Sequence, residues 1–218
     1  MLASFFAGFA CSRPSHAATD LPEPAQELHG QDAPESAKVV LAGGCFWCTE
    51  AVFEQLDGVD SVISGYAGGT QDSANYQAVS AGRTDHAEAI EVHYNPRKIS
   101  FGQLLQVFFS AAHDPTQVDR QGNDIGRQYR SAIFYADEQQ KAVAESYIQQ
   151  LNDAKIFDKP IATTLEPLDQ FFPAEQYHQD YVVHNPGNPY VAAVAVPKVN
   201  KVRKDFGELL KKNEAASP

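Results

Sequence analysis

One stretch constrains the fold of this chain more than any other, the octet Gly43-Gly44-Cys45-Phe46-Trp47-Cys48-Thr49-Glu50. An apolar run at residues 39–42 leads into it, and a segment with helical character follows to about residue 56. The two glycines let the chain turn sharply and let other groups approach the backbone closely. The pattern therefore predicts that Cys45 lies where a buried strand ends and a helix begins.

The position of Cys45 predicts a reactive thiol. A helix N-terminus presents unpaired N–H groups and a partial positive charge, and this field favours the thiolate, which is the nucleophilic form of cysteine. Phe46 and Trp47 place apolar surface beside the sulfur. The alternative is that Cys45 is a small core residue and that the two aromatic side chains only pack.

The composition narrows the range of partners. The chain has 218 residues, enough for one catalytic domain with a good core, and a formal net charge of −11. This charge argues against nucleic acid or an anionic membrane surface as a partner. Its three cysteines, Cys11, Cys45 and Cys48, are too few for a disulfide scaffold, and no stretch is long enough to span a bilayer.

The N-terminal region resembles a targeting segment. An apolar stretch at residues 2–11 is followed by Ser15-His16-Ala17, so residues 1–17 resemble a secretory signal peptide without its basic n-region, cleaved after Ala17. We expect export to the periplasm, with a disordered cytosolic leader as the alternative. Residues 18–36 have a linker's composition, residues 37–197 form the catalytic domain, and residues 198–218 form a C-terminal helix and tail.

Strand-like and helix-like segments alternate along the domain. Strands are predicted at 39–42, 59–66, 88–94, 130–136 and 162–168, and polar loops at 72–82 and 116–127. Ser100 and Gln103 form a capping box for one helix, and Asp137 caps another. Shorter helices are expected at 174–184 and 199–210. We predict an α/β (α+β) two-layer sandwich with a mixed central sheet.

Glu88 is a candidate acid. Residues 88–94 alternate strictly, and Glu88 has the same parity as the apolar residues Ile90, Val92 and Tyr94. A carboxyl group on that face is partly desolvated, which raises its pKa and lets it donate a proton near neutral pH. The alternative is a carboxylate at the strand edge that faces water.

Cys48 follows Cys45 by three residues, so the two lie on one side of the helix. At this spacing their Cα atoms are roughly 5 Å apart, within the range of about 4.4–6.8 Å that a disulfide needs. Cys48 is therefore either a resolving thiol or a buried core residue.

The Cys-x-x-Cys also leaves open a general thiol-disulfide oxidoreductase of the thioredoxin type. A non-catalytic binding module is a third alternative, and one Cys-x-x-Cys without His-Glu-x-x-His gives little reason to expect zinc.

The octet and several later blocks, in order, resemble the A-type peptide methionine sulfoxide reductases. The resemblance runs from about residue 38 to residue 197. Its later blocks are Gly65-Tyr66-Ala67-Gly68-Gly69, Asn75-Tyr76, Gly82-x-x-x-His86-Ala87-Glu88-Ala89, His113-Asp114-Pro115, Arg120-Gln121-Gly122-Asn123-Asp124-x-Gly126-x-Gln128-Tyr129-Arg130-Ser131 and Tyr177-His178-Gln179-Asp180-Tyr181.

The resemblance implies a ferredoxin-like core and reduction of the S epimer of methionine sulfoxide, free or in proteins, as a repair activity. It implies Cys45 as nucleophile and Glu88 as proton donor. The remaining implied residues are the methyl-binding Phe46 and Trp47, the hydroxyls of Tyr76 and Tyr129 around the sulfoxide oxygen, and the supporting carboxylate Asp124. A monomer without a cofactor is expected, reduced by an external thiol such as thioredoxin.

The regeneration of Cys45 is where this chain departs from many members of that family. Those members carry resolving cysteines near the C-terminus, whereas this chain has no cysteine after Cys48. A sulfenic acid on Cys45 would therefore react with Cys48 to form a disulfide, or directly with an external reductant.

Overall fold

The computed structural model describes residues 21–28 and 33–212. Its strands are β1 (Ala37–Gly43), β2 (Val59–Ala67), β3 (Ala87–Tyr94), β4 (Arg120–Gln121), β5 (Asp124–Ile125), β6 (Ser131–Tyr135), β7 (Thr164–Pro167) and β8 (Phe171–Pro173). Its α-helices are α1 (Phe46–Phe53), α2 (Tyr76–Ser80), α3 (Phe101–Val107), α4 (Glu138–Asp153), α5 (Tyr181–His184) and α6 (Val196–Asp205). Short turns of other helix types lie between them, including η3 (Arg127–Tyr129) and η4 (Gln176–His178).

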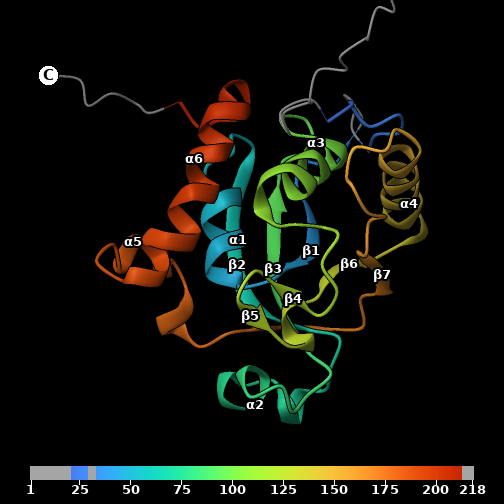
Figure 1. Ribbon diagram of the computed structural model, residues 1–218. Coiled ribbons are helices and arrows are strands. Elements are labelled where there is room, and N and C mark those ends of the chain that lie inside the picture. Colours follow the sequence, from blue (N-terminus) through green and yellow to red (C-terminus); the bar gives the residue numbers. More distant parts are fainter. Residues whose placement is uncertain (1–20, 29–32, 213–218) are drawn as a thin grey trace, which may run out of the picture.

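The main sheet has six strands in the order β7-β6-β1-β3-β2-β8, and β4 and β5 form a separate hairpin. The four inner strands are antiparallel, and β7 runs parallel to β6 at one edge. Helix α1 connects β1 to β2, and α3 lies on the connection from β3 to β6, each passing over an intervening strand (Figure 1). This is the split β-α-β arrangement of a ferredoxin-like core, so the predicted fold class is confirmed.

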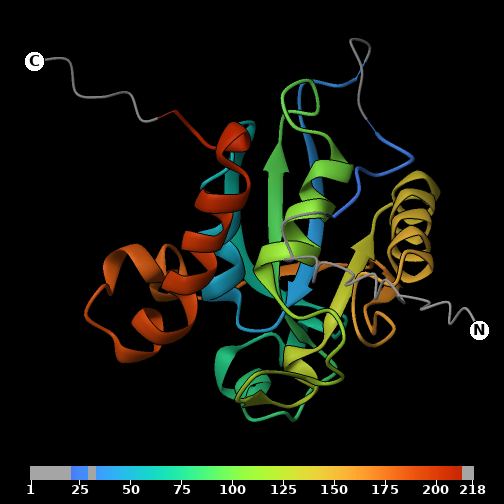
Figure 2. The same cartoon turned by 45° about the horizontal axis from the view of Figure 1, so that its top comes forward.

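The two faces of the sheet are covered differently. Strand residues of one parity, among them Val39, Leu41 and Ile90, join the main core with α1, α3 and α4. In Figure 2, α3 (green) lies in front of the central strands and α4 (gold) lies beside β6. Residues of the other parity are mostly small, and they form a second cluster with Leu168 and Phe171. The domain is therefore a two-layer sandwich in which helices cover one face of the sheet and segments without helices cover the other.

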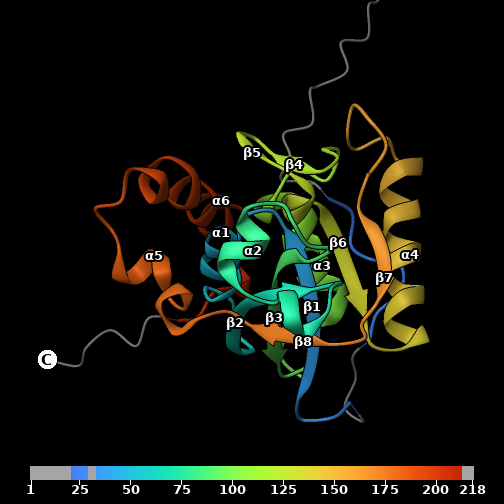
Figure 3. The same ribbon diagram turned by 90° about the horizontal axis from the view of Figure 1, so that it is seen from below.

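A short connection makes the sheet curl. Strands β7 and β8 lie at opposite edges, which in a flat sheet would be roughly 24 Å apart at the usual strand spacing. Only residues 168–170 join them, and four Cα–Cα steps reach at most about 15 Å. Figure 3 shows this segment crossing beneath the central strands. The edges of the sheet must therefore bend toward each other.

Several local details differ from the sequence predictions. The loop predicted at 72–82 contains α2, because the Asn75 side chain accepts a hydrogen bond from the Ala78 N–H and caps that helix. The helix predicted at 174–184 is split into η4 and α5, which a left-handed Asp180 separates. The C-terminal helix begins at Val196 and ends at Asp205, earlier at both ends than the predicted 199–210.

Part of the segment expected to be a linker packs on the domain. Leu21 is 8% exposed and belongs to the main core, and the Pro22 carbonyl accepts a hydrogen bond from the Tyr147 hydroxyl. The Glu27 carboxylate accepts one from the Gly102 N–H at the start of α3. The expected signal peptide, residues 1–17 with Cys11, lies outside the described residues. Within residues 21–28 and 33–212, no helix is long and apolar enough to cross a membrane.

Candidate active site

A small cavity opens at the sheet end where β1 finishes and where β3 and β6 begin. Its volume is about 170 Å³, room for roughly five waters and less than the usual 300 Å³ or more of a drug-sized ligand site. It is lined by Cys45, Phe46, Trp47, Tyr76, Glu88, Asp124, Tyr129 and Tyr190. All the predicted site residues except Cys48 therefore line one cavity, and Tyr190 is an addition. Cys48 is fully buried beside it and packs with Cys45.

Gly44 brings the β4–β5 hairpin to the thiol. Its φ is +89°, a backbone conformation that side chains disfavour, and a Cβ there would lie 2.5 Å from Cγ of Gln121. The Gln121 amide bonds both the N–H and the carbonyl of Asp114, at 3.0 and 2.8 Å, which fixes the hairpin. The close approach allowed by glycine thus positions Asp124, on the second hairpin strand, at the cavity.

Glu88 is buried, as its parity in the strand predicts, and it lines the cavity together with Cys45. It is 2% exposed, and its Oε2 accepts a hydrogen bond of 3.1 Å from the backbone N–H of Phe46, the first residue of α1. Burial raises the pKa of Glu88 to about 8, although the Phe46 N–H acts in the opposite direction. The side chain therefore keeps its proton at neutral pH and can donate it.

The prediction of a lowered pKa for Cys45 is wrong for this arrangement. The hydrogen bond with the Cys48 side chain, burial and nearby negative charge all raise the pKa of Cys45. Cys45 is the N-cap of α1, but its side chain makes no capping hydrogen bond, and the first helical N–H points to Glu88 instead. The same thiol–thiol hydrogen bond lowers the pKa of Cys48, so the first proton leaves the pair on the Cys48 side.

The indole of Trp47 forms one wall of the cavity and is held from two sides. Its Nε1 donates a hydrogen bond of 3.1 Å to Nδ1 of His178. The Tyr181 ring stacks on its face, with centroids 3.7 Å apart and an interplanar angle of 7°. Phe46 lies next to it, with centroids 6.2 Å apart. An apolar side chain in the cavity would therefore meet a fixed aromatic surface.

Tyr76 is anchored by a carboxylate that the sequence analysis did not single out. Oε1 of Glu175 accepts a hydrogen bond of 3.0 Å from the Tyr76 N–H, and Oε2 accepts one of 2.9 Å from the Tyr66 hydroxyl. The Tyr76 ring also contacts His178, with centroids 4.3 Å apart. Burial raises the pKa of Tyr76 and of Tyr129, so both phenols remain hydrogen-bond donors.

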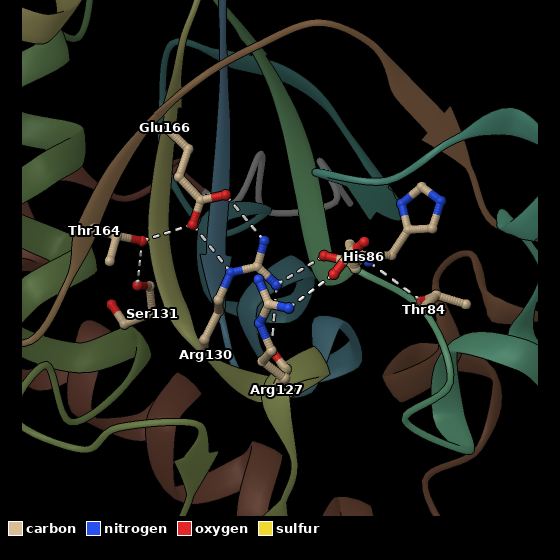
Figure 4. Close-up of polar contacts among 8 residues, drawn as sticks. Thr84, His86, Arg127, Arg130, Ser131, Thr164 and Glu166 are labelled. Carbon is tan, nitrogen blue, oxygen red and sulfur yellow. Dashed lines mark hydrogen bonds and ion pairs between the residues drawn. The ribbon is translucent and has the colours of Figure 1, made fainter.

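Tyr129 lies at the end of η3, a turn held by an ion pair between the buried Arg130 and the half-buried Glu166. Arg130 has only 8% of its side chain exposed, and it donates to both carboxylate oxygens of Glu166 at 3.0 Å each. Figure 4 shows the Arg130 guanidinium between Glu166 on one side and the turn of Arg127 on the other. It also donates to the Asp85 carbonyl at 3.2 Å, so the residue next to Tyr129 connects the η3 turn to β7 and to the segment before β3.

Three aromatic or imidazole side chains at this site were missed from the sequence, namely His178, Tyr181 and Tyr190. His178 and Tyr181 belong to a family-like block, but no local spacing connects them to Trp47, more than a hundred residues earlier. Tyr190 donates a hydrogen bond of 2.6 Å to Oδ2 of Asp124. Only the return of the C-terminal segment past α1 brings Tyr190 to the cavity and brings His178 and Tyr181 against Trp47.

Two other kinds of site, a metal centre and a second cavity, are weaker candidates for the active site. Among residues 21–28 and 33–212, no group of three or more His, Cys, Asp or Glu side chains is arranged to hold a metal ion. A larger cavity of about 520 Å³ lies where residues 23–27 meet α3 and the end of α6, and its lining contains no cysteine or histidine. The thiol pair and the raised pKa of Glu88 make the smaller cavity the candidate active site.

The comparisons with known proteins agree on one family. The model of the family described as peptide methionine sulfoxide reductase matches residues 37–210. Peptide methionine sulfoxide reductase MsrA 2 of Synechocystis sp. is 51% identical over 193 residues, 88% of this chain and 90% of that protein. MsrA of Haloquadratum walsbyi is 51% identical over 175 residues, 80% and 99% of the two chains. The crystal structure of reduced Mxr1 from Saccharomyces cerevisiae superposes with a TM-score of 0.65 and 33% sequence identity. The match covers 75% of this chain and 92% of the Mxr1 chain.

Proposed function

Because the chain belongs to the peptide methionine sulfoxide reductase family, an oxidoreductase family of protein repair, we propose that Cys45 reduces the S epimer of methionine sulfoxide, with Glu88 as proton donor. The observation that carries this proposal is the buried carboxyl of Glu88, whose pKa is raised to about 8 beside the reactive thiol. An ionised carboxylate could not protonate the sulfoxide oxygen, whereas this one keeps its proton at neutral pH.

The cavity suits a methionine sulfoxide side chain. The substrate methyl packs against Phe46 and the fixed indole of Trp47, and the sulfoxide oxygen points to the polar wall formed by Glu88, Tyr76 and Tyr129. A phenol hydroxyl donates a hydrogen bond to an oxygen that gains negative charge as sulfur is attacked. The volume of about 170 Å³ fits one side chain, so the rest of a peptide would lie outside the cavity.

The thiol pair supplies the nucleophile. Cys48 loses its proton first, and a proton then moves from Cys45 to Cys48 along their hydrogen bond, which leaves the thiolate on Cys45. The Cys45 thiolate attacks the sulfoxide sulfur while Glu88 protonates the oxygen. Transfer of the hydroxyl to Cys45 releases methionine and leaves Cys45 as a sulfenic acid, so cysteine sulfur is oxidised by two electrons and the substrate is reduced by two.

We further propose that Cys48 resolves this sulfenic acid. Its sulfur attacks Cys45, water leaves, and a Cys45–Cys48 disulfide forms. Cys48 is one helical turn away, and its N–H bonds the Cys45 carbonyl at 3.1 Å. Within the described residues, these are the two free cysteines.

An external dithiol of the thioredoxin type would complete the cycle. Cys45 lines the cavity and Cys48 is buried behind it, so the external thiolate would attack the Cys45 sulfur and Cys48 would be the leaving group. The lowered pKa of Cys48 favours this direction, because a thiol of lower pKa leaves faster. Export of the protein to the periplasm remains our proposal from the pattern of residues 1–17.

A thiol count after one turnover tests the proposed function. The full chain carrying Cys11→Ser is exposed to L-methionine-S-sulfoxide without reductant, and thiols and free methionine are measured. We expect loss of both remaining thiols with about one methionine per chain. Loss of one thiol with a trapped sulfenic acid would retain the reductase and reject Cys48 as the resolving residue. Loss of none, without methionine, would reject the reductase mechanism in favour of general thiol-disulfide exchange.

A further inference from the structure

The Tyr190 hydroxyl connects the buried thiol pair to the cavity. It donates a hydrogen bond of 2.6 Å to Oδ2 of Asp124, and the Cys48 thiol donates to it across 3.9 Å. The hydroxyl is also within hydrogen-bonding reach of Cys45. Asp124 lines the cavity, whereas Cys48 does not. The three side chains therefore form a continuous hydrogen-bonded path from the buried Cys48 sulfur to the cavity.

Disulfide formation needs such a path. To attack a sulfenic acid on Cys45, Cys48 must lose its proton, and the departing hydroxyl must gain one. The surroundings of Cys48 are largely apolar, since Val191, Ala195 and Val194 pack around the pair. Within the described part of the chain, the Cys48 thiol has hydrogen bonds to Cys45 and Tyr190 alone. Once Cys45 is oxidised, Tyr190 is the partner that remains to accept the Cys48 proton.

We infer that Tyr190 and Asp124 carry the Cys48 proton to the hydroxyl that leaves Cys45. This inference rests on the proposed Cys45–Cys48 disulfide. The Cys48 proton passes to the Tyr190 oxygen as the Tyr190 proton passes to Asp124. Asp124 then protonates the departing hydroxide, the S–O bond of the sulfenic acid breaks, and the S–S bond forms. The products are one disulfide and one water, and no further oxidant or reductant is required.

Two further observations suit Tyr190 to this role. Burial raises the pKa of Tyr190 far above its ordinary range, so the phenol keeps its proton and always has one to pass on. Its ring meets the Trp47 indole edge-on, with centroids 6.1 Å apart and an interplanar angle of 77°. Tyr190→Phe therefore removes the hydroxyl while keeping the ring that packs against Trp47.

The test measures methionine formation and disulfide formation separately, in the full chain carrying Cys11→Ser. Parent and Tyr190→Phe proteins are mixed with L-methionine-S-sulfoxide without reductant and quenched at intervals. Methionine, trapped sulfenic acid and disulfide are then measured. In Tyr190→Phe we expect disulfide formation to slow by at least tenfold, and by a larger factor than methionine formation, so that sulfenic acid accumulates. Equal slowing of both steps, or unchanged disulfide formation, would overturn the relay.

Two further variants test the path through Asp124 and the resolving role of Cys48. Asp124→Asn keeps an oxygen that can accept from Tyr190 but cannot carry a proton, so it should reproduce the Tyr190→Phe accumulation. Disulfide formation at the parent rate in Asp124→Asn would overturn the path through Asp124. Cys48→Ser should stop at the sulfenic acid in every background. Absence of a disulfide in the parent would instead reject the proposed resolving step itself, which distinguishes the two failures.

Discussion

The Trp47 indole donates its N–H to Nδ1 of His178 at 3.1 Å, so the imidazole must be neutral and carry its proton on Nε2. His178 is almost fully buried among aromatic rings, and burial lowers its pKa below the ordinary value. Its Nε2 has no hydrogen-bond partner among the described residues and lies 4.0 Å from a carboxylate oxygen of Glu175. A second proton on His178 would remove the acceptor that orients Trp47.

His178→Ala should therefore raise KM for methionine sulfoxide by about tenfold with a smaller change in kcat, because Trp47, the proposed wall for the substrate methyl, loses one hydrogen bond. His178→Asn is the matched control, since its Oδ1 can take the place of Nδ1. In the parent, KM should rise only as pH falls through the lowered pKa of His178, which lies below the ordinary histidine value of about 6.5. The Asn variant should lack this rise, and an identical pH dependence in both would contradict the assignment.

Glu88→Gln removes the proposed proton donor without changing the size of the side chain. We expect single-turnover methionine formation to slow by about 10²–10⁴-fold. Since the pKa of Glu88 is about 8, the donor is protonated below that pH and lost above it, so the parent rate should fall on the alkaline side near pH 8. Glu88→Gln should lack this limb. A limb near the ordinary glutamate pKa of about 4.3 would show that Glu88 is not the donor.

Tyr76→Phe and Tyr129→Phe each remove one hydroxyl from the polar wall of the cavity. Each should lower kcat by about tenfold, and the double variant by considerably more, because the remaining phenol can no longer compensate. Both phenols keep their protons at working pH, so neither variant should change the shape of the alkaline limb. Steady-state kinetics with free methionine sulfoxide measures both effects. If the double variant retains the parent kcat, the hydroxyls do not contact the sulfoxide oxygen.

Local sequence rules predicted the features that depend on neighbouring residues. Strand alternation placed Glu88 on the core face, and Ser100 with Gln103 forms the predicted capping box. Asp137 caps α4 by accepting from the Gln140 N–H. Each of these follows from side-chain period or from a bond a few residues long, and such information is contained in a short window of sequence.

Packing and contacts in the folded chain determine the pKa of Cys45 and the positions of His178 and Tyr190, which local rules could not predict. The helix N-terminus alone favoured a lowered pKa for Cys45, but burial and the Cys48 thiol reverse the direction. Tyr190 reaches the cavity, and His178 reaches Trp47, only because the C-terminal segment folds back onto α1, and neither residue carries a local signal of that contact. The electrostatics of a buried thiol depends on everything packed around it, so a short sequence window predicts its position better than its pKa.

Glu166→Gln should destabilise the domain by about 2 kcal/mol, because it leaves the buried guanidinium of Arg130 without its charged partner. Burial alone would raise the pKa of Glu166, but hydrogen bonds from Arg130 and Thr164 outweigh it and lower the pKa. The contribution is therefore complete above the ordinary glutamate value and lost as pH falls through the lowered pKa. Urea unfolding at several pH values measures this change.

Asp85→Asn provides the matched control for that variant. It breaks the neighbouring ion pair between Asp85 and Arg127. The Asp85 side chain is 73% exposed and the Arg127 side chain 59%, and an exposed pair contributes at most about 1 kcal/mol. The Asp85 carbonyl that accepts from Arg130 is unchanged by this substitution. Equal losses of stability in Glu166→Gln and Asp85→Asn would contradict the argument that burial makes the Arg130 pair the stronger one.

Gly44→Ala tests how the thiol and the β4–β5 hairpin are brought together. The left-handed φ of +89° costs a non-glycine residue about 1–2 kcal/mol, and the new Cβ would lie 2.5 Å from Cγ of Gln121. Relief of that contact moves Gln121 and with it the hairpin that carries Asp124, so sulfenic acid should persist longer after each turnover. Gly187→Ala is the control, since a Cβ there meets nothing within 4 Å. If Gly44→Ala only lowers stability and disulfide formation keeps the parent rate, the hairpin position does not govern the resolving step.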